Sequence, residues 1–120
     1  MSIALWICQA LLSVVFASSG FRKSTQSKQR MIETGQTGVK RYDLPFIRCI
    51  AAAELLGAAG LILPWSTRIL PILTPLAATG LGIIMVGAAR AHARQHEPKN
   101  VAVNLVLLAL CVFVTIGRLA

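Results

Sequence analysis

Four apolar runs, each long enough to cross a membrane as an α-helix, dominate the chain. They cover about residues 3–19, 46–65, 69–89 and 101–117. About 20 apolar residues in a helix span the hydrocarbon of a bilayer. Only 13% of the residues are charged, against roughly 25% in soluble domains, so too few polar residues remain to cover four such runs. The sequence therefore predicts an all-α integral membrane protein with one transmembrane domain, residues 1–120.

Each run carries one stripe of polar or small residues at helical spacing. Residues three and four positions apart share a helix face, and small or polar faces pack together inside a membrane. Turning the four stripes inward predicts a four-helix bundle. The stripes contain Gln9 and Ser13 in the first run, Glu54, Gly57 and Ala58 in the second, Ala78, Gly82, Met85 and His92 in the third, and Asn104, Cys111, Thr115 and Arg118 in the fourth.

Glycine and proline residues predict where the helices begin and end. Gly20 is expected to end the first helix, and Pro64 to close the second. Pro75 is expected to kink or delay the third helix, and Pro98 to stop it. Between Ser24 and Thr34 the sequence predicts a short interfacial helix lying on the lipid headgroups, with a solvated loop as the alternative.

Basic residues gather in the two connections that follow the first and third runs, and these connections must lie on the same side. The positive-inside rule then places both in the cytoplasm, with both termini outside. A net charge of +8 would also suit nucleic acid. Because the charges flank the spans, anionic lipid headgroups are the expected partner instead, and no nucleic-acid partner is expected.

The reactive side chains do not form a thiol or metal motif. Cys8, Cys49 and Cys111 lie singly within the runs, which argues against a dithiol oxidoreductase and a zinc site. His92 and His96 are four residues apart, a spacing that can clip a metal. Without a third ligand nearby, we expect no metal site.

Glu54 is the one acidic residue inside a run, flanked by small residues. It lies roughly 12 Å into its helix at 1.5 Å per residue, close to the midplane. A carboxylate there must be protonated, paired or hydrated. Ser13 and Thr79 are candidate hydrogen-bond partners, and the candidate cations are Arg48, Lys23 and Arg90, the last two snorkelling from their helix ends. Glu54 is then either a proton-handling or ligand-orienting group, or a structural glutamate that joins helices.

His92 and Asn104 are expected at a similar depth, near the basic connections. His92 lies at the membrane boundary, where it could pass protons or bind the polar head of a ligand. The alternative is a solvated histidine on the rim of the bundle. Asn104 is either a ligand contact or a polar link between helices.

Several segments together resemble one known family. They are GFRK at Gly20–Lys23, RCIAAAELLGAAGLILP at Arg48–Pro64, MVGAARAHAR at Met85–Arg94 and the last span, Asn104–Arg118. Over essentially the whole chain they resemble the DoxX-like family of small bacterial four-span membrane proteins. The resemblance implies a four-helix bundle and an association with membrane redox complexes that oxidise quinols. It also implies that five residues match family-typical polar sites: Lys23, Glu54, His92, Asn104 and Arg118.

Three function classes follow. The first is a redox-associated module that binds a quinone or another lipophilic small molecule inside the bundle, with a redox partner protein. The second is a non-enzymatic carrier of a lipid-like or hydrophobic substrate, and the third is a structural subunit of a membrane complex or homo-oligomer. Quinone is the one cofactor considered, and no catalytic residue is assigned. The expected ligand-binding or proton-handling residues are Glu54, His92, Asn104, Lys23, Gln9, Ser13 and Arg118.

Overall fold

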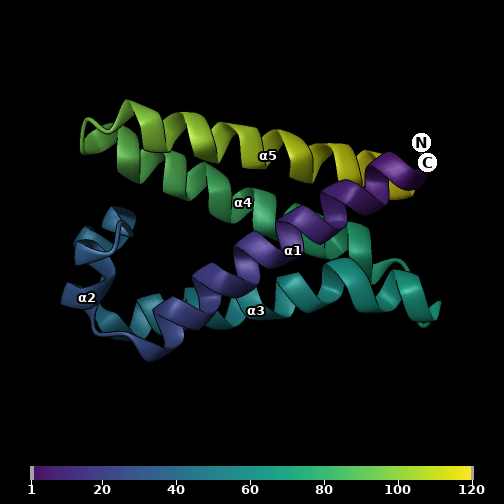
Figure 1. Cartoon of the computed structure of the whole chain (residues 1–120), viewed down its shortest axis with the longest axis horizontal. Helices are drawn as coiled ribbons and strands as arrows, with labels where there is room; N and C mark the ends of the chain where they lie inside the picture. The colour runs from purple at the N-terminus through teal and green to yellow at the C-terminus, as the bar shows by residue number, and fades with distance from the viewer. Residues whose placement is uncertain (1, 120) are drawn as a thin grey trace.

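The computed structural model describes residues 2–119, without the side chains of Ser2 and Arg41, and is helical almost throughout (Figure 1). Four of its helices are long and apolar enough to cross a membrane, which confirms the predicted all-α membrane fold. The elements are α1 (Ser2–Thr25), α2 (Lys28–Glu33), the 3-10 helix η1 (Thr37–Arg41), α3 (Leu44–Thr67), α4 (Leu73–Arg94) and α5 (Pro98–Leu119).

The four long helices form two pairs, α1 with α3 and α4 with α5, which pack together through α3 and α4. Both long-helix pairs meet at the end where α1 starts and α5 finishes, here called the terminal end (Figure 1). At the opposite end the pairs diverge, and the connections 26–43 and 95–97 lie there. We call this the loop end.

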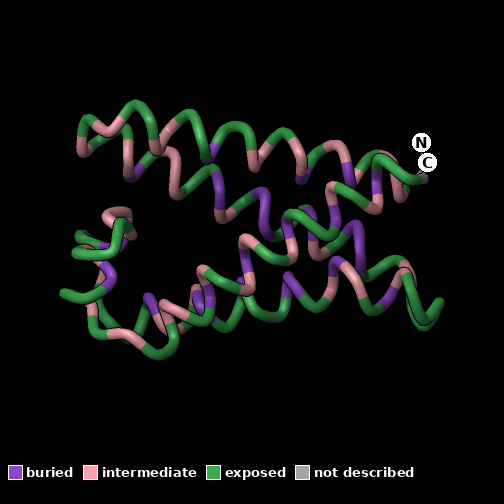
Figure 2. The backbone as a smooth tube through the Cα atoms, in the orientation of Figure 1, coloured by how far each residue is buried: buried purple, intermediate pink, exposed green. Residues whose placement is uncertain are grey.

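The apolar core lies between the helices toward the terminal end. Figure 2 shows buried positions on the sides of the helices that face one another and exposed positions outside. Many large apolar side chains point outward, for example Leu56, Ile83 and Val106, as expected where lipid surrounds the protein. The buried cluster consists of Leu12, Phe16, Ala58, Leu61, Ala78, Leu81, Met85, Cys111 and Val114.

The long connection 26–43 is folded and anchored. Its predicted short helix is present as α2, where the Ser27 hydroxyl accepts a hydrogen bond from the Arg30 N–H at 3.1 Å. Met31 and Val39 are buried against Ile47 of α3 in a small second core. These contacts exclude the alternative of a solvated loop, whereas the position of α2 on the headgroups remains a prediction.

The expected helix ends at Gly20 and Pro64 were wrong. α1 continues past Gly20 to Thr25, because Gly20 faces α3: a Cβ there would lie 3.0 Å from the Ala51 carbonyl oxygen. Glycine therefore allows the close approach of two helices rather than ending one. The expected delay of the third helix is confirmed: α4 begins at Leu73 rather than at about residue 69, so that Pro75 lies in its first turn, where proline is tolerated.

Pro64 lies inside α3, which continues to Thr67. Because proline has no N–H, it cannot donate to the carbonyl of Gly60 four residues earlier. The hydroxyl of Thr74 in α4 donates to this carbonyl instead, at 2.8 Å. The neighbouring helix thus supplies the hydrogen bond that the Gly60 carbonyl lacks because of Pro64. Membrane helices commonly accommodate proline in this way.

Candidate functional site

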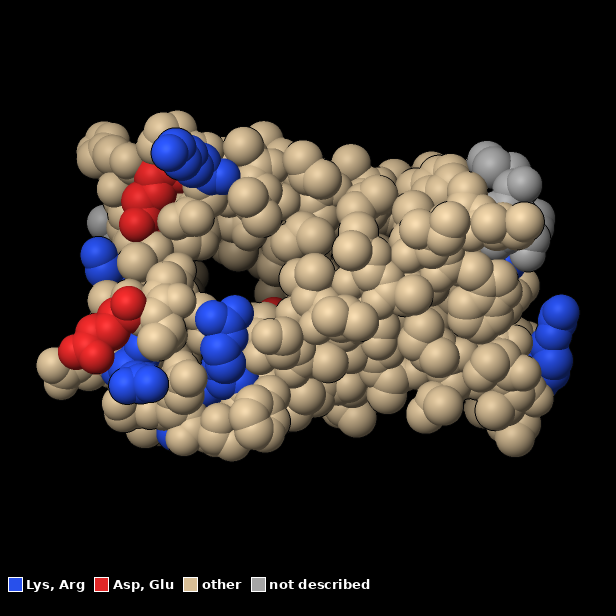
Figure 3. Space-filling view, in the orientation of Figure 1, with Lys and Arg blue, Asp and Glu red and all other residues tan. Residues whose placement is uncertain are grey.

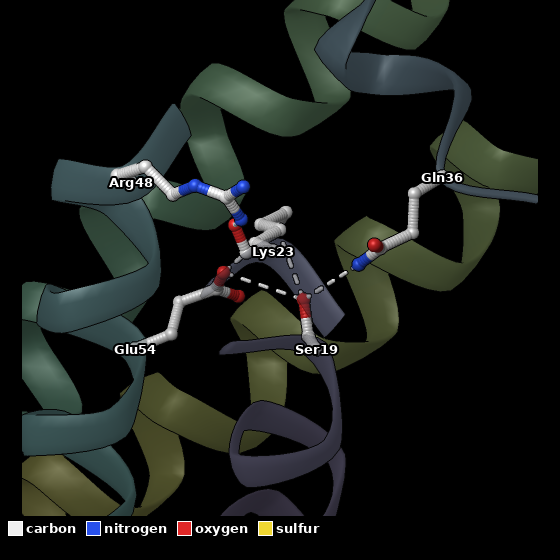
Figure 4. A network of polar contacts seen from close by, with 5 residues as sticks. All are labelled: Ser19, Lys23, Gln36, Arg48 and Glu54. Atoms are coloured by element: carbon white, nitrogen blue, oxygen red, sulfur yellow. Dashed lines mark hydrogen bonds and ion pairs between the residues drawn. The ribbon is translucent and has the colours of Figure 1, made fainter. Parts of the chain in front are cut away.

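Glu54 of α3 is almost fully buried and forms an ion pair with Lys23 of α1 (Figure 4). Its Oε1 accepts hydrogen bonds from Lys23 Nζ at 2.8 Å and from Ser19 Oγ at 3.3 Å. Ser19 Oγ in turn accepts from Lys23 Nζ at 3.0 Å and from Gln36 Nε2 at 3.1 Å. The carboxylate is therefore paired, and the connection 26–43 is tied to the pair through Gln36.

The expected hydroxyl partners of Glu54 were wrong. Ser13 donates to the Ala58 carbonyl at 2.9 Å. Thr79 donates within its own helix to the Pro75 carbonyl at 2.8 Å. Both hydroxyls thus find backbone acceptors close by, as Ser and Thr commonly do in helices.

Lys23 is the candidate cation that reaches Glu54. It can do so because α1 extends beyond Gly20 and carries the lysine above the carboxylate. Arg48 lies beside the pair in Figure 4 and donates instead to the backbone carbonyl of Lys23. Arg90 is exposed on α4. Arg48 thereby satisfies one of the carbonyls that the end of α1 leaves without a helical partner.

A pocket of about 420 Å³ opens beside this ion pair at the loop end of the bundle. Figure 3 shows the hollow next to the charged side chains of that end. Apolar side chains such as Phe16, Val39 and Met85 form much of its wall. Its polar lining comes from α1, the connection 26–43, α3, α4 and α5, and includes Ser19, Arg22, Lys23, Gln36, Tyr42, Glu54, His92 and Asn104.

Three polar atoms of the lining are buried without a hydrogen-bond partner among the described residues. They are Arg22 Nε, Gln36 Oε1 and Asn104 Nδ2. Buried polar atoms in folded proteins nearly always have a partner. Oε1 accepts both hydrogen bonds to Glu54, so Oε2 remains available to accept a hydrogen bond from a bound molecule. The residues that line the pocket thus carry two donors and two acceptors for which the described residues supply no partner.

His92 lies on the pocket wall, and its ring contacts the Glu97 carboxylate. His92 Nδ1 lies 2.8 Å from Glu97 Oε1, and Thr37 of η1 donates to the same oxygen at 2.8 Å. α4 ends at Arg94 and His96 adopts a left-handed conformation, so the chain turns back and Glu97 meets His92. The hydrogen bonds from His92 and Thr37 lower the pKa of Glu97 below its ordinary value.

The early end of α4 also separates the two histidines. His96 lies in the turn, exposed, and no longer shares a helix face with His92. Within residues 2–119, no group of three His, Cys, Asp or Glu side chains is placed to hold a metal ion.

The sequence model of the DoxX-like family matches residues 7–114. The chain belongs to the DoxX-like family. Comparisons with curated proteins and with solved structures gave no match. Membership in the family together with the four apolar helices makes this a multi-pass membrane protein.

Two of the expected site residues of this DoxX-like protein lie at the terminal end, away from the pocket. Arg118 Nε donates to Gln9 Oε1 at 2.6 Å, and Gln9 Nε2 donates to the Leu61 carbonyl at 2.6 Å. The Arg118 guanidinium also stacks on the Trp65 ring, 4.4 Å from its centroid. Gln9 and Arg118 therefore join α1, α3 and α5 and do not contribute to the site around Glu54.

Sequence reasoning missed Ser19, Arg22 and Gln36 of this DoxX-like protein. Ser19 precedes Lys23 by four residues and so shares its helix face, which was a usable signal. Arg22 comes after Gly20, which was expected to end the helix. A position of Arg22 on the pocket wall was therefore not predicted. No local pattern predicts that Gln36, in a polar connection, folds back onto Ser19.

Proposed function

We propose that this DoxX-like protein binds a lipophilic small molecule with a hydrogen-bonding head, of the quinone class, in the pocket beside Glu54. The observation that carries the proposal is the set of three unpartnered polar atoms in a largely apolar pocket. Its volume of about 420 Å³ falls in the range of small-molecule sites, roughly 300–1,000 Å³. An apolar wall with a few convergent polar groups is typical of such sites.

The unpartnered atoms match the chemistry of a quinone and its reduced form. Quinone carbonyl oxygens accept hydrogen bonds, and Asn104 Nδ2 and Arg22 Nε supply donors for them. The hydroxyl groups of a quinol donate, and Gln36 Oε1 and Glu54 Oε2 supply acceptors. Oxidation of a quinol to a quinone releases two electrons and two protons. In this proposal the Glu54 carboxylate accepts one proton, water at the loop end accepts the other, and a redox partner protein accepts the two electrons.

The proposal includes an orientation in the membrane. The loop end carries most of the basic residues, so we place it on the cytoplasmic side of a bacterial inner membrane. Lys23, Arg22 and Arg48 then lie near the headgroups of that leaflet, and the pocket lies just inside it. The ligand head would rest at the boundary between headgroups and hydrocarbon.

The test is calorimetric titration of the protein in lipid nanodiscs with a benzoquinone that carries a ten-carbon alkyl tail. We expect saturable binding, weakened about fivefold in Asn104→Leu, because one hydrogen bond is worth roughly 1 kcal/mol. Without the probe, Asn104→Leu should melt at the same temperature or higher, since it removes an unpartnered buried amide. A loss of stability would instead indicate a structural asparagine.

The matched control is Asn100→Leu, on the same helix but outside the pocket lining. It should bind the probe like the unchanged protein. Absence of saturable binding to the unchanged protein would contradict the proposal, as would equal affinities in Asn104→Leu and Asn100→Leu.

A further inference from the structure

The pocket opens on the flank of the bundle rather than at its end. Figure 3 looks across the long axis, along which the helices run, and the hollow is visible in that view. At the terminal end α1 and α5 are joined by the Gln9–Arg118 hydrogen bond. Toward the loop end they diverge, and Val15 of α1 and Val103 of α5 both line the pocket between them. In a membrane, an opening between two spans faces lipid.

The chemistry of the lining changes along this opening. Arg22 and Gln36 line it toward the loop end, where charged side chains gather in Figure 3. Val15 and Leu107 line it farther from the loop end, and Val103, beside Asn104 on α5, lines it with a side chain that is 56% exposed. A compact polar ligand would leave this apolar part of the opening unused. A molecule with a polar head and an apolar tail matches both parts.

Resting on the proposed function, we infer that the ligand is a tailed molecule already dissolved in the bilayer, and that its tail leaves the pocket between Val15 and Val103. The head forms hydrogen bonds with the unpartnered polar atoms near Glu54. The tail passes over the apolar edge formed by α1 and α5 and continues among the lipid chains. The ligand then enters and leaves sideways, without crossing water.

The first test locates the tail. The probe is a benzoquinone whose ten-carbon tail carries a photoreactive diazirine, and the competitor is the same quinone without the diazirine. After irradiation in nanodiscs and mass spectrometry, labelling that the competitor suppresses several-fold should map around Val15 and around Val103 to Leu107. Suppressed labelling confined to α3 or to the connection 26–43 would overturn the inference, while absence of any suppressed labelling would overturn the proposed function as well.

The second test closes the opening. Val103→Trp places a large ring in the gap, whereas Leu105→Trp places it on an exposed position of the same helix outside the lining. We expect Val103→Trp to weaken binding of the tailed quinone several-fold and to leave binding of a tail-less benzoquinone unchanged. Equal losses for both probes would place the obstruction in the head site and contradict the tail path. An unchanged affinity for the tailed probe would contradict it too.

Discussion

Lys23 Nζ lies 2.8 Å from Glu54 Oε1, and the two residues come from helices α1 and α3, which pack side by side. The Glu54 side chain is 1% exposed and that of Lys23 is 15% exposed, so the charge of one is compensated mainly by the other. Ser19 touches both and completes the network. The ion pair therefore fixes the part of the α1–α3 packing that forms one side of the pocket.

Removing both partners of this pair should lower the unfolding free energy by less than the sum of the two single removals. Breaking a buried pair leaves an uncompensated charge, typically at a cost of about 3–5 kcal/mol. We expect Lys23→Met and Glu54→Gln each to lower the unfolding free energy substantially, and the double variant to lose less than the sum. Denaturant unfolding in detergent micelles measures this double-mutant cycle. Lys28→Met is the control, and additive losses would contradict a coupled pair.

The Thr74 hydroxyl should contribute to stability because it donates the hydrogen bond to Gly60 that Pro64 cannot donate. Thr74→Val leaves the Gly60 carbonyl without a partner, which we expect to lower the unfolding free energy by about 1–3 kcal/mol. In a Pro64→Ala background the alanine N–H can bond to that carbonyl, so the same substitution should cost clearly less. The melting temperatures of the four proteins measure the difference. An equal cost in both backgrounds would mean that Thr74 acts through packing alone.

Two glycines should respond in opposite ways to alanine. A Cβ at Gly20 would lie 2.8 Å from Leu55 Cγ and 3.0 Å from the Ala51 carbonyl oxygen, so α1 and α3 must move apart. We expect Gly20→Ala to cost about 1–3 kcal/mol of stability, as overpacking does. A Cβ at Gly80 meets nothing within 4 Å, so Gly80→Ala should be neutral or stabilising. Thermal unfolding compares them, and equal effects would contradict the close contact at Gly20.

The Glu97 contacts should give the protein an acid-sensitive component of stability. The hydrogen bonds from His92 and Thr37 lower the folded-state pKa of Glu97 below its ordinary value of 4.5. A depressed pKa contributes stability that is present above the unfolded-state value and is lost as the pH falls through the folded-state value. Melting temperatures measured downward from pH 5 should therefore fall in the unchanged protein. In Glu97→Gln this part of the fall should be missing, whereas Glu33→Gln, on α2, should retain it.

The predictions from sequence were correct where one helix decides the outcome. Hydropathy and length are local properties, so the four spans and the all-helical class follow from the chain itself. The small residues around Glu54 also indicate its inward direction, since they mark the face that packs. The predicted ends at Gly20 and Pro64 were wrong because the neighbouring helix, and not the residue's own propensity, determines the outcome at both positions.

What the sequence determined by itself is a four-span membrane bundle with one buried acid on the packing face of its second long helix. Only the tertiary structure decided that Lys23 pairs with this acid, that Gln9 and Arg118 meet at the opposite end, and that the connection 26–43 folds over a pocket. The reason is physical: a stripe of polar residues indicates a direction around a helix axis. The partner that each residue meets depends on how far neighbouring helices extend and slide along one another, and on how a connection folds back.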